Sequence, residues 1–159
     1  MTEQRSGDMK IHNIDRLDEQ FIWRDQAGLA TQYLGTAAGS EKLYVNIDRV
    51  PPGAYSTKYH SHSQMEEFFL ILGGSGTLRL NGAECPVSEG DFIAKPAGRG
   101  ITHTFYNSGD ETLVILDAGT VEREDICYYP DEGVYLDKSP RGRHVYGADE
   151  GWTSDPNKV

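Results

Sequence analysis

The sequence predicts an all-β domain, built as a sandwich or barrel of many short strands. Apolar and polar residues alternate along short segments, and turn residues recur about every 8–12 residues. No helical pattern longer than three turns is visible. The 159 residues are enough for one domain with a core of its own.

Residues 1–40 are expected to form an N-terminal extension that packs on the barrel. The first ten are polar, and Ile11–Trp23 mixes apolar with charged positions, as a short helix or an edge strand would. Phe21, Ile22 and Trp23 are the side chains expected to be buried there. The stretch rich in alanine and glycine that follows predicts a loop.

Residues 41–119 are expected to form the barrel. Its first strand, Glu41–Val50, alternates apolar and polar side chains and ends at the turn Pro51–Gly53. A second strand from Ala54 to His62 follows. Its periodicity places Lys58 on the face of the histidines, where it either reaches solvent at the rim or serves as a cation for an anionic substrate.

Six further strands are expected in the barrel. Phe68–Leu72 is apolar on both faces, so it needs cover on both. Thr77–Leu80 and Glu84–Val87 are joined by Asn81-Gly82, a pair that tolerates positive φ and therefore predicts a tight hairpin. The other expected strands are Phe92–Ala94, His103–Asn107 and Thr112–Leu116.

Residues 120–159 are expected to form an extended C-terminal arm of the same domain. The segment is polar and rich in turn residues, but it has too many aromatic side chains for a disordered tail. This arm, or a second subunit, could cover the outer side of Phe68–Leu72. Arg141, Arg143 and His144 form a small basic spot, which is either ordinary surface or a lid over an anion.

The composition argues against several partners. The formal charge of −10 disfavours nucleic acid and anionic membranes. The longest apolar run, Phe68–Leu72, is far shorter than the ~20 residues that span a bilayer, and the first ten residues do not resemble a signal peptide. Cys85 and Cys127 form no spaced pair and are expected to be reduced and partly buried. We therefore expect a soluble, cytoplasmic protein.

Two histidines one residue apart mark the candidate site. In an extended strand, His60 and His62 point to the same side, so their imidazoles could bind one ion. Glu66 and Glu67 follow closely and could return a carboxylate to it. Imidazole nitrogen and carboxylate oxygen together suit a first-row transition metal better than calcium or magnesium.

A third histidine lies in a matching context. An isolated His-x-His is more often an incidental surface feature than a metal site. His103, however, is preceded by turn residues and an apolar segment and is followed by Asn107, so a second strand could cross the first and add an imidazole.

These two stretches resemble the two motifs of the cupin superfamily. Gly53…His60-x-His62-x4-Glu67-x6-Gly74 is similar to the first, and Gly90-x5-Pro96-x-Gly98…His103-x3-Asn107 to the second. Each carries extra loop residues before its histidines, so the pocket mouth is expected to differ. The resemblance covers about residues 43–119 and implies a double-stranded β-helix, or jelly-roll barrel, here with the N-terminal extension and the C-terminal arm.

The resemblance also implies a ligand set. The positions that correspond to cupin metal ligands are His60, His62, Glu67 and His103. They would hold one divalent transition metal ion, namely Mn, Fe, Ni or Zn. Strand periodicity does not choose between Glu66 and Glu67, because both faces of that strand are apolar. Matching the Gly74–Gly76 turn to that of the family favours Glu67.

Three imidazoles and one carboxylate leave about two positions open on a six-coordinate ion, which is typical of catalytic sites. We expect Lewis-acid chemistry on a small oxygenated, possibly anionic metabolite, and the resemblance points to sugar-phosphate isomerisation. The alternatives are an Fe(II)-dependent dioxygenase and a non-catalytic small-ligand-binding cupin. The resemblance also implies a homodimer. The sequence assigns no catalytic residue besides the metal ligands.

Overall fold

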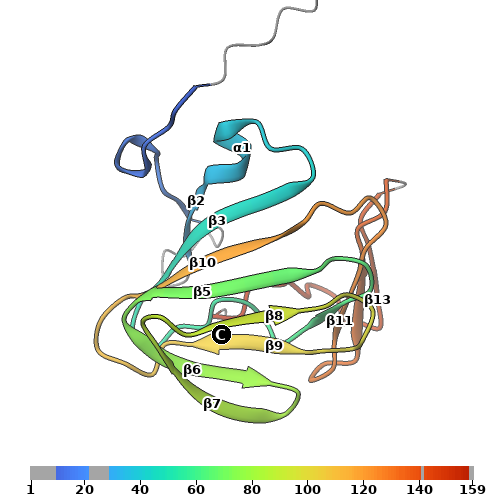
Figure 1. Ribbon diagram of the computed structural model, residues 1–159. Coiled ribbons are helices and arrows are strands. Elements are labelled where there is room, and N and C mark those ends of the chain that lie inside the picture. The colour runs from blue at the N-terminus through green and yellow to red at the C-terminus, as the bar shows by residue number, and fades with distance from the viewer. Residues whose placement is uncertain (1–9, 22–28, 141, 158–159) are drawn as a thin grey trace, which may run out of the picture.

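The computed structural model describes residues 10–21, 29–140 and 142–157, which form an almost entirely β structure (Figure 1). Its largest sheet has the order β1-β2-β3-β10-β5-β8, and a second has the order β7-β6-β9. All neighbouring strands pair antiparallel. The strands of these two sheets are β1 (Gln20–Phe21), β2 (Ala30–Tyr33), β3 (Leu43–Val50), β5 (Glu67–Gly73), β6 (Ser75–Leu80), β7 (Ala83–Ser88), β8 (Phe92–Lys95), β9 (His103–Tyr106) and β10 (Leu113–Thr120). The predicted all-β jelly roll is confirmed.

The hairpin between β6 and β7 forms as predicted. Asn81 and Gly82 both adopt positive φ, 47° and 81°, and Leu80 pairs with Ala83 directly across the turn. Because both central residues of a type I′ turn need positive φ, this dipeptide fixes the register of the two strands. The predicted strand at Glu41–Val50 is also present, as β3.

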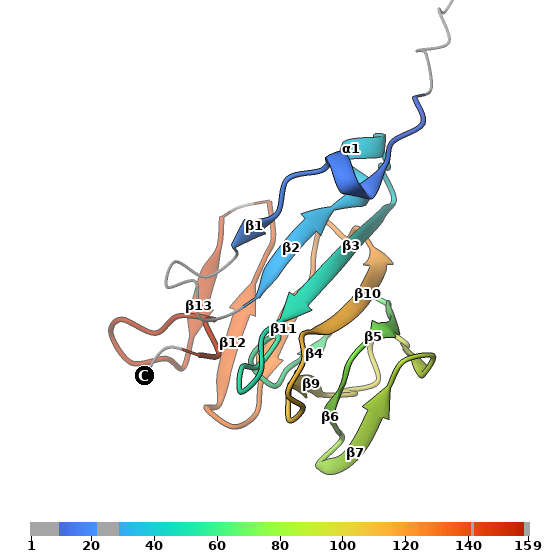
Figure 2. The ribbon, with the colours of Figure 1, turned by 90° about the vertical axis from the view of Figure 1, so that its left-hand side faces the viewer.

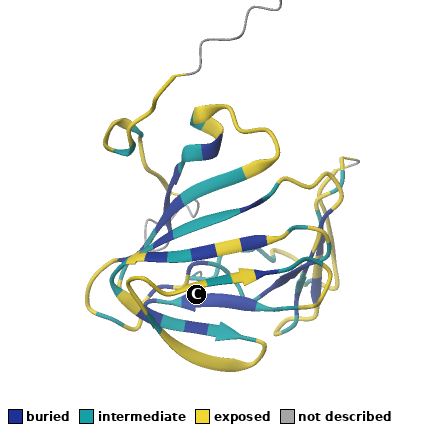
Figure 3. Cartoon of the chain, in the orientation of Figure 1, coloured by how far each residue is buried: buried dark blue, intermediate teal, exposed yellow. Residues whose placement is uncertain are grey.

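The main core lies between the two sheets. Buried and exposed side chains alternate along β5, as Figure 3 shows, so that Phe69 and Ile71 face inward. The core cluster consists of Leu29, Val50, Ala54, Phe69, Ile71, Leu78, Phe105, Leu113 and Ile115. Each buried aliphatic or aromatic side chain contributes about 1.5–3 kcal/mol of transfer free energy, so this cluster accounts for much of the stability.

The predicted strand from Ala54 to His62 is only partly correct. Only its last two residues form a strand, β4 (Ser61–His62), while Tyr55 and His60 make single bridges to β9. Between these two bridges, side chains interrupt the regular backbone hydrogen bonding to β9. Ser56 Oγ accepts a hydrogen bond from the Phe105 amide, so a side chain takes a backbone donor that a regular strand would pair.

The N-terminal region also differs from expectation. The stretch predicted as a loop contains the short helix α1 (Leu34–Ala38), which ends at Gly39 with φ 83°. The segment before it contains both alternatives that the sequence allowed, a 3-10 turn at Ile14–Arg16 and the edge strand β1. Phe21 is half-exposed and was wrongly predicted to be buried, and Ile22 and Trp23 lie outside the described residues.

The C-terminal arm forms strands of its own. β11 (Ile126–Tyr129), β12 (Val134–Asp137) and β13 (His144–Tyr146) join β4 in a sheet of order β13-β12-β11-β4. Figure 2 shows this hairpin array beside the main sheet. Cys127 pairs with His62 across β11 and β4. The arm is therefore attached to the strand that carries the His-x-His pair.

The arm leaves the outer side of β5 open in the described part of the chain. Phe68 and Leu72 remain 39% and 43% exposed, and Phe92 on the neighbouring β8 is 67% exposed. Phe68 and Phe92 stack with ring centroids 6.0 Å apart. The arm was one of the two covers considered for this strand, and it does not cover it in the described part of the chain.

The cysteines differ from each other. Both are free thiols, but Cys85 is exposed and Cys127 is fully buried, so the expectation that both are partly buried was wrong. Among the described residues, no helix has both the length and the apolar character needed to cross a membrane.

Candidate metal centre

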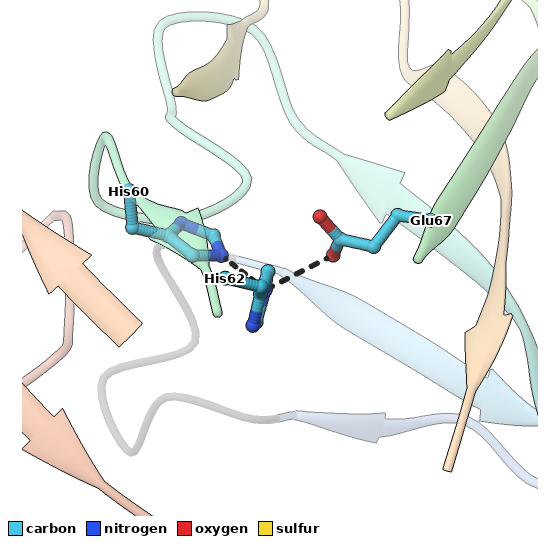
Figure 4. A group of neighbouring side chains, drawn as sticks. All are labelled: His60, His62 and Glu67. Atoms are coloured by element: carbon cyan, nitrogen blue, oxygen red, sulfur yellow. Dashed lines mark hydrogen bonds and ion pairs between the residues drawn. The ribbon is translucent and has the colours of Figure 1, made fainter. Parts of the chain in front are cut away.

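Three of the predicted ligands meet directly, as Figure 4 shows. His60 Nε2 lies 2.9 Å from His62 Nε2, and His62 Nε2 lies 3.3 Å from Glu67 Oε1. The potential ligand atoms of these three residues all fall within 4.8 Å of one another, and all three residues are buried. The pairing of β4 with the arm and of β5 with β8 holds these side chains in position.

The outer nitrogens of the two histidines are already occupied. His60 Nδ1 lies 2.7 Å from the Lys58 carbonyl oxygen, and His62 Nδ1 lies 2.6 Å from Asp125 Oδ2. A carbonyl or carboxylate at Nδ1 fixes the ring orientation and leaves Nε2 for a metal ion. This arrangement is typical of histidine ligands.

His103 lies beside this group. Its ring centroid is 5.1 Å from that of His60, it is 2% exposed, and its backbone bridges to His60. Its Nδ1 lies 2.7 Å from Lys95 Nζ. The structure therefore brings all four predicted ligands together, although the tight group within 4.8 Å comprises only His60, His62 and Glu67.

The two candidate glutamates point in opposite directions. Glu67 is 5% exposed and lies on the inner face with Phe69, whereas Glu66 is exposed on the other side of the chain. A one-residue change in strand position reverses the face, so only one of the two can reach the histidines.

A buried lysine that we did not predict completes the inner wall. Lys95 pairs with Glu67 in the register of β5 and β8, and its Nζ lies 2.5 Å from Glu67 Oε2. Burial opposes ionisation of Glu67, but the hydrogen bond from His62 and the charges of His103 and Lys95 outweigh it, so the pKa of Glu67 lies well below its usual range. Since Lys95 occupies Oε2, Oε1 is the oxygen that faces His62.

Asp125, in the arm, is the second residue missed. It accepts hydrogen bonds from the amides of Gln64 and Met65 as well as from His62, so it fixes the loop between the ligands. Burial disfavours the charged imidazole, but hydrogen bonds to Asp125, Cys127 and Glu67 raise the pKa of His62 to about 10. A bound metal ion would replace the proton at this position.

Asp125→Asn is expected to weaken metal binding about 10–100-fold, because the carboxylate that orients His62 is lost. Titration of the metal-free protein with Mn²⁺ by calorimetry measures the change. Glu124→Gln is the matched control, since Glu124 is the exposed neighbour in the same loop. Equal affinities of the two variants would show that Asp125 does not support the site.

Carboxylates and a phenol line the same cavity as the ligands, which has a volume of about 270 Å³. Tyr44 Oη lies 2.9 Å from Asp117 Oδ1 and 3.3 Å from Glu67 Oε1, so it links two acids on the inner face of the main sheet. Asp48, beside Asp117, accepts a hydrogen bond from Thr31 Oγ1 at 2.8 Å. These acids sit in strands β3 and β10, and we did not predict them as site residues.

Two lysines occupy different surroundings. Lys138, from the arm, is exposed and lines this cavity. Lys58 instead forms an ion pair of 2.9 Å with Glu132 and lines a separate groove of about 600 Å³. Lys58 therefore does not serve the histidine pocket, and Lys138 is the one lysine or arginine that lines this pocket among the described residues.

The donor set fits a divalent transition metal ion. Two imidazole Nε2 atoms converge with a carboxylate oxygen, a third imidazole lies alongside, and buried carboxylates supply negative charge. Mixed nitrogen and oxygen donors suit Mn, Fe, Ni or Zn. His62, Asp125 and Cys127 form a second group of close ligand atoms, but it shares His62 with the first.

Comparisons with known proteins agree with this geometry. Residues 46–119 match the model of the cupin domain family. A gentisate 1,2-dioxygenase of a Ralstonia species is 25% identical over 114 residues, 72% of this chain and 30% of the dioxygenase. An oxalate-binding protein of Thermotoga maritima is 32% identical over 68 residues, 43% of this chain. The chain thus spans about a third and about half of these two curated relatives, at 30% and 54% of their lengths.

Two solved structures are similar over most of their length. A sugar phosphate isomerase from a cupin superfamily of Silicibacter pomeroyi is 26% identical with a TM-score of 0.78, and the match covers 86% of this chain and 91% of that one. A candidate sugar phosphate isomerase of Acidithiobacillus ferrooxidans is 28% identical with a TM-score of 0.75, covering 83% and 85%. Together with the matching motifs and the jelly-roll fold, these similarities show that this chain belongs to the cupin superfamily.

Proposed function

We propose that this protein is a metal-dependent isomerase of small phosphorylated sugars. The observation that carries the proposal is the pocket itself. The pocket brings the convergent donors His60, His62 and Glu67 together with the acids Asp48 and Asp117, which share the inner face of the main sheet with Glu67. The structural similarity to two proteins described as sugar phosphate isomerases supports the same chemistry.

We propose His60, His62, Glu67 and His103 as ligands of one divalent ion. Such an ion supplies Lewis-acid polarisation of a carbonyl or hydroxyl oxygen when bound. The remaining residues do the rest: Lys95 and Asp125 hold Glu67 and His62 in place, and Lys138 offers a positive charge at the opening for an anionic group. The acids Asp48 and Asp117, which share the inner face of the main sheet with Glu67, face the space left for the substrate.

The direct test is isomerase-dependent proton exchange. The protein is loaded with Mn²⁺ and incubated in deuterium oxide with a panel of aldose and ketose phosphates, and ¹H NMR follows loss of the hydrogen next to the carbonyl. Exchange that disappears in His60→Ala supports the proposal, because this change removes a donor of the convergent group. No exchange with any member of the panel would contradict it.

Oxygen activation is the second candidate. The match to a gentisate 1,2-dioxygenase covers 72% of this chain, and histidine-carboxylate donors also suit ferrous iron. Oxygen uptake by the protein loaded with Fe²⁺ in the presence of gentisate would favour this reaction. Ligand binding without turnover in either assay would instead favour a binding protein.

We also propose a homodimer that buries the open outer side of β5 and β8. Phe68, Leu72 and Phe92 form an exposed apolar patch there, which a second copy of the chain could cover. Light scattering of the purified protein measures the mass, and Phe92→Lys is expected to shift it toward the monomer. The division into residues 1–40, 41–119 and 120–159 of one domain, a cytoplasmic location and the absence of nucleic-acid and membrane partners stay predictions.

A further inference from the structure

Two carboxyl groups on the main sheet lie side by side in the cavity of the histidines. In the register of β3 and β10, Asp48 lies opposite Ile115 and Asp117 lies opposite Asn46, so the two acids are diagonal neighbours on one face. Both side chains line the cavity. Two neighbouring carboxylates repel each other, which favours one proton on the pair.

Hydroxyl donors hold the other oxygens. Thr31 Oγ1 donates to Asp48 Oδ1, and Tyr44 Oη donates to Asp117 Oδ1. No lysine or arginine in the described part of the chain forms an ion pair with either acid. A pair of neighbouring acids held by neutral donors favours a single shared negative charge, since two charges side by side would repel.

The surroundings of Asp48 and Asp117 also favour a proton on this pair of acids. Burial, followed by the charges of Asp48 and Glu67, raises the pKa of Asp117 well above its usual value. Burial also raises the pKa of Asp48, to about 6. The charged or titratable groups that face the pair come from four strands and the arm: Tyr33, Tyr44, Glu67, Lys95 and Lys138.

A purely structural role accounts poorly for this placement. A polar pair that only filled space would sit in the core, whereas Asp48 and Asp117 line the cavity that the metal-ligand residues also line.

We propose that Asp48 and Asp117 form the acid–base pair that moves a proton between two substrate carbons. This inference rests on the proposed isomerase function. The singly protonated pair accepts the proton from the hydroxyl-bearing carbon, the electrons of that C–H bond form a C=C bond, and the carbonyl π electrons move to oxygen. The pair then returns the proton to the former carbonyl carbon, and the proton of the original hydroxyl moves to the other oxygen. No oxidant or reductant is consumed.

The substitution Asp117→Asn separates the proposed proton transfer from a structural role of the Asp117 side chain. The amide oxygen can still accept from Tyr44, so this hydrogen bond is kept while proton transfer is lost. Exchange of the substrate hydrogen is expected to slow about 100-fold or more, with Mn²⁺ affinity unchanged. Asp110→Asn, at an exposed turn, is the matched control and should exchange as the unaltered protein does.

Infrared spectroscopy tests the shared proton without any substrate. At neutral pH the Mn²⁺-loaded protein should show the C=O stretch of a protonated carboxylic acid, which shifts on ¹³C labelling of aspartate and disappears in Asp117→Asn. Absence of this band would show that Asp48 and Asp117 hold no proton, and it would overturn their role as an acid–base pair. If the unaltered protein exchanges and Asp117→Asn does so equally fast, the pair is wrong and the proposed function stands. If the unaltered protein exchanges no substrate, the proposed function and the role of the pair in it both fail, and the band decides only whether the proton is shared.

Discussion

Glu67→Gln is expected to lose the bound metal ion, whereas Glu66→Gln is expected to keep it. Glu67 is buried on the inner face of β5 with Oε1 3.3 Å from His62 Nε2, and Glu66 is exposed on the opposite face. Glutamine keeps the shape but replaces the anionic oxygen with a neutral one, which attracts a divalent cation far less. We expect the affinity of Glu67→Gln for Mn²⁺ to fall by more than about 100-fold, beyond the usual effect of an outer-sphere change.

Elemental analysis of the purified variants and calorimetric titration with Mn²⁺ measure this difference. Circular dichroism and denaturant unfolding of both variants check that each is folded, because Glu67→Gln also removes the partner of Lys95. The pair of variants differs by one position in the chain, so expression and bulk charge are matched. Metal loss in Glu66→Gln with retention in Glu67→Gln would reassign the ligand.

The sequence was most informative where chemistry is local. The imidazoles of His60 and His62 meet, and their spacing in an extended segment predicted that both would point one way. The placement of His103 needed a second strand to cross the first, and the family resemblance supplied that expectation. Asn81-Gly82 likewise set a turn that two adjacent residues determine.

The acids Asp48 and Asp117 could not be predicted to line the pocket, because this depends on which face of a strand turns inward. Along β3 the apolar residues Val45 and Ile47 would be the obvious core face, yet Tyr44 and Asp48 line the cavity. A cavity lined by polar side chains reverses the usual rule that apolar faces are buried. An acidic residue inside each of two paired strands, at Asp48 and Asp117, was the available signal.

Asp125 and Lys95, which hold the ligand side chains in place, reach the site through pairing of strands that are distant in the sequence. Asp125 reaches His62 because β11 pairs with β4, a contact between segments about sixty residues apart. Lys95 reaches Glu67 only because β8 pairs with β5 in one particular register. Nothing within either segment indicates its partner, although a lysine within the strand ahead of Pro96 is unusual enough to suggest a specific one.

Lys95→Met is expected to destabilise the metal-free protein by about 3–5 kcal/mol, because it removes one of the two cations, Lys95 and protonated His62, that face the buried carboxylate of Glu67. Both side chains are at most 6% exposed, so water cannot replace the lost partner. Denaturant unfolding monitored by fluorescence measures the change, and Lys42→Met, at an exposed position, is the control.

Adding Mn²⁺ distinguishes the loss of the Lys95–Glu67 ion pair from a loss of side-chain packing. A bound divalent ion would neutralise Glu67, so it should stabilise Lys95→Met more than the unaltered protein. The double variant Lys95→Met/Glu67→Gln should recover part of the stability without metal, since no uncompensated charge is left. A Lys95→Met protein within about 1 kcal/mol of the unaltered one would mean that Glu67 finds compensation elsewhere, and Lys95 would then not determine which carboxylate oxygen faces His62.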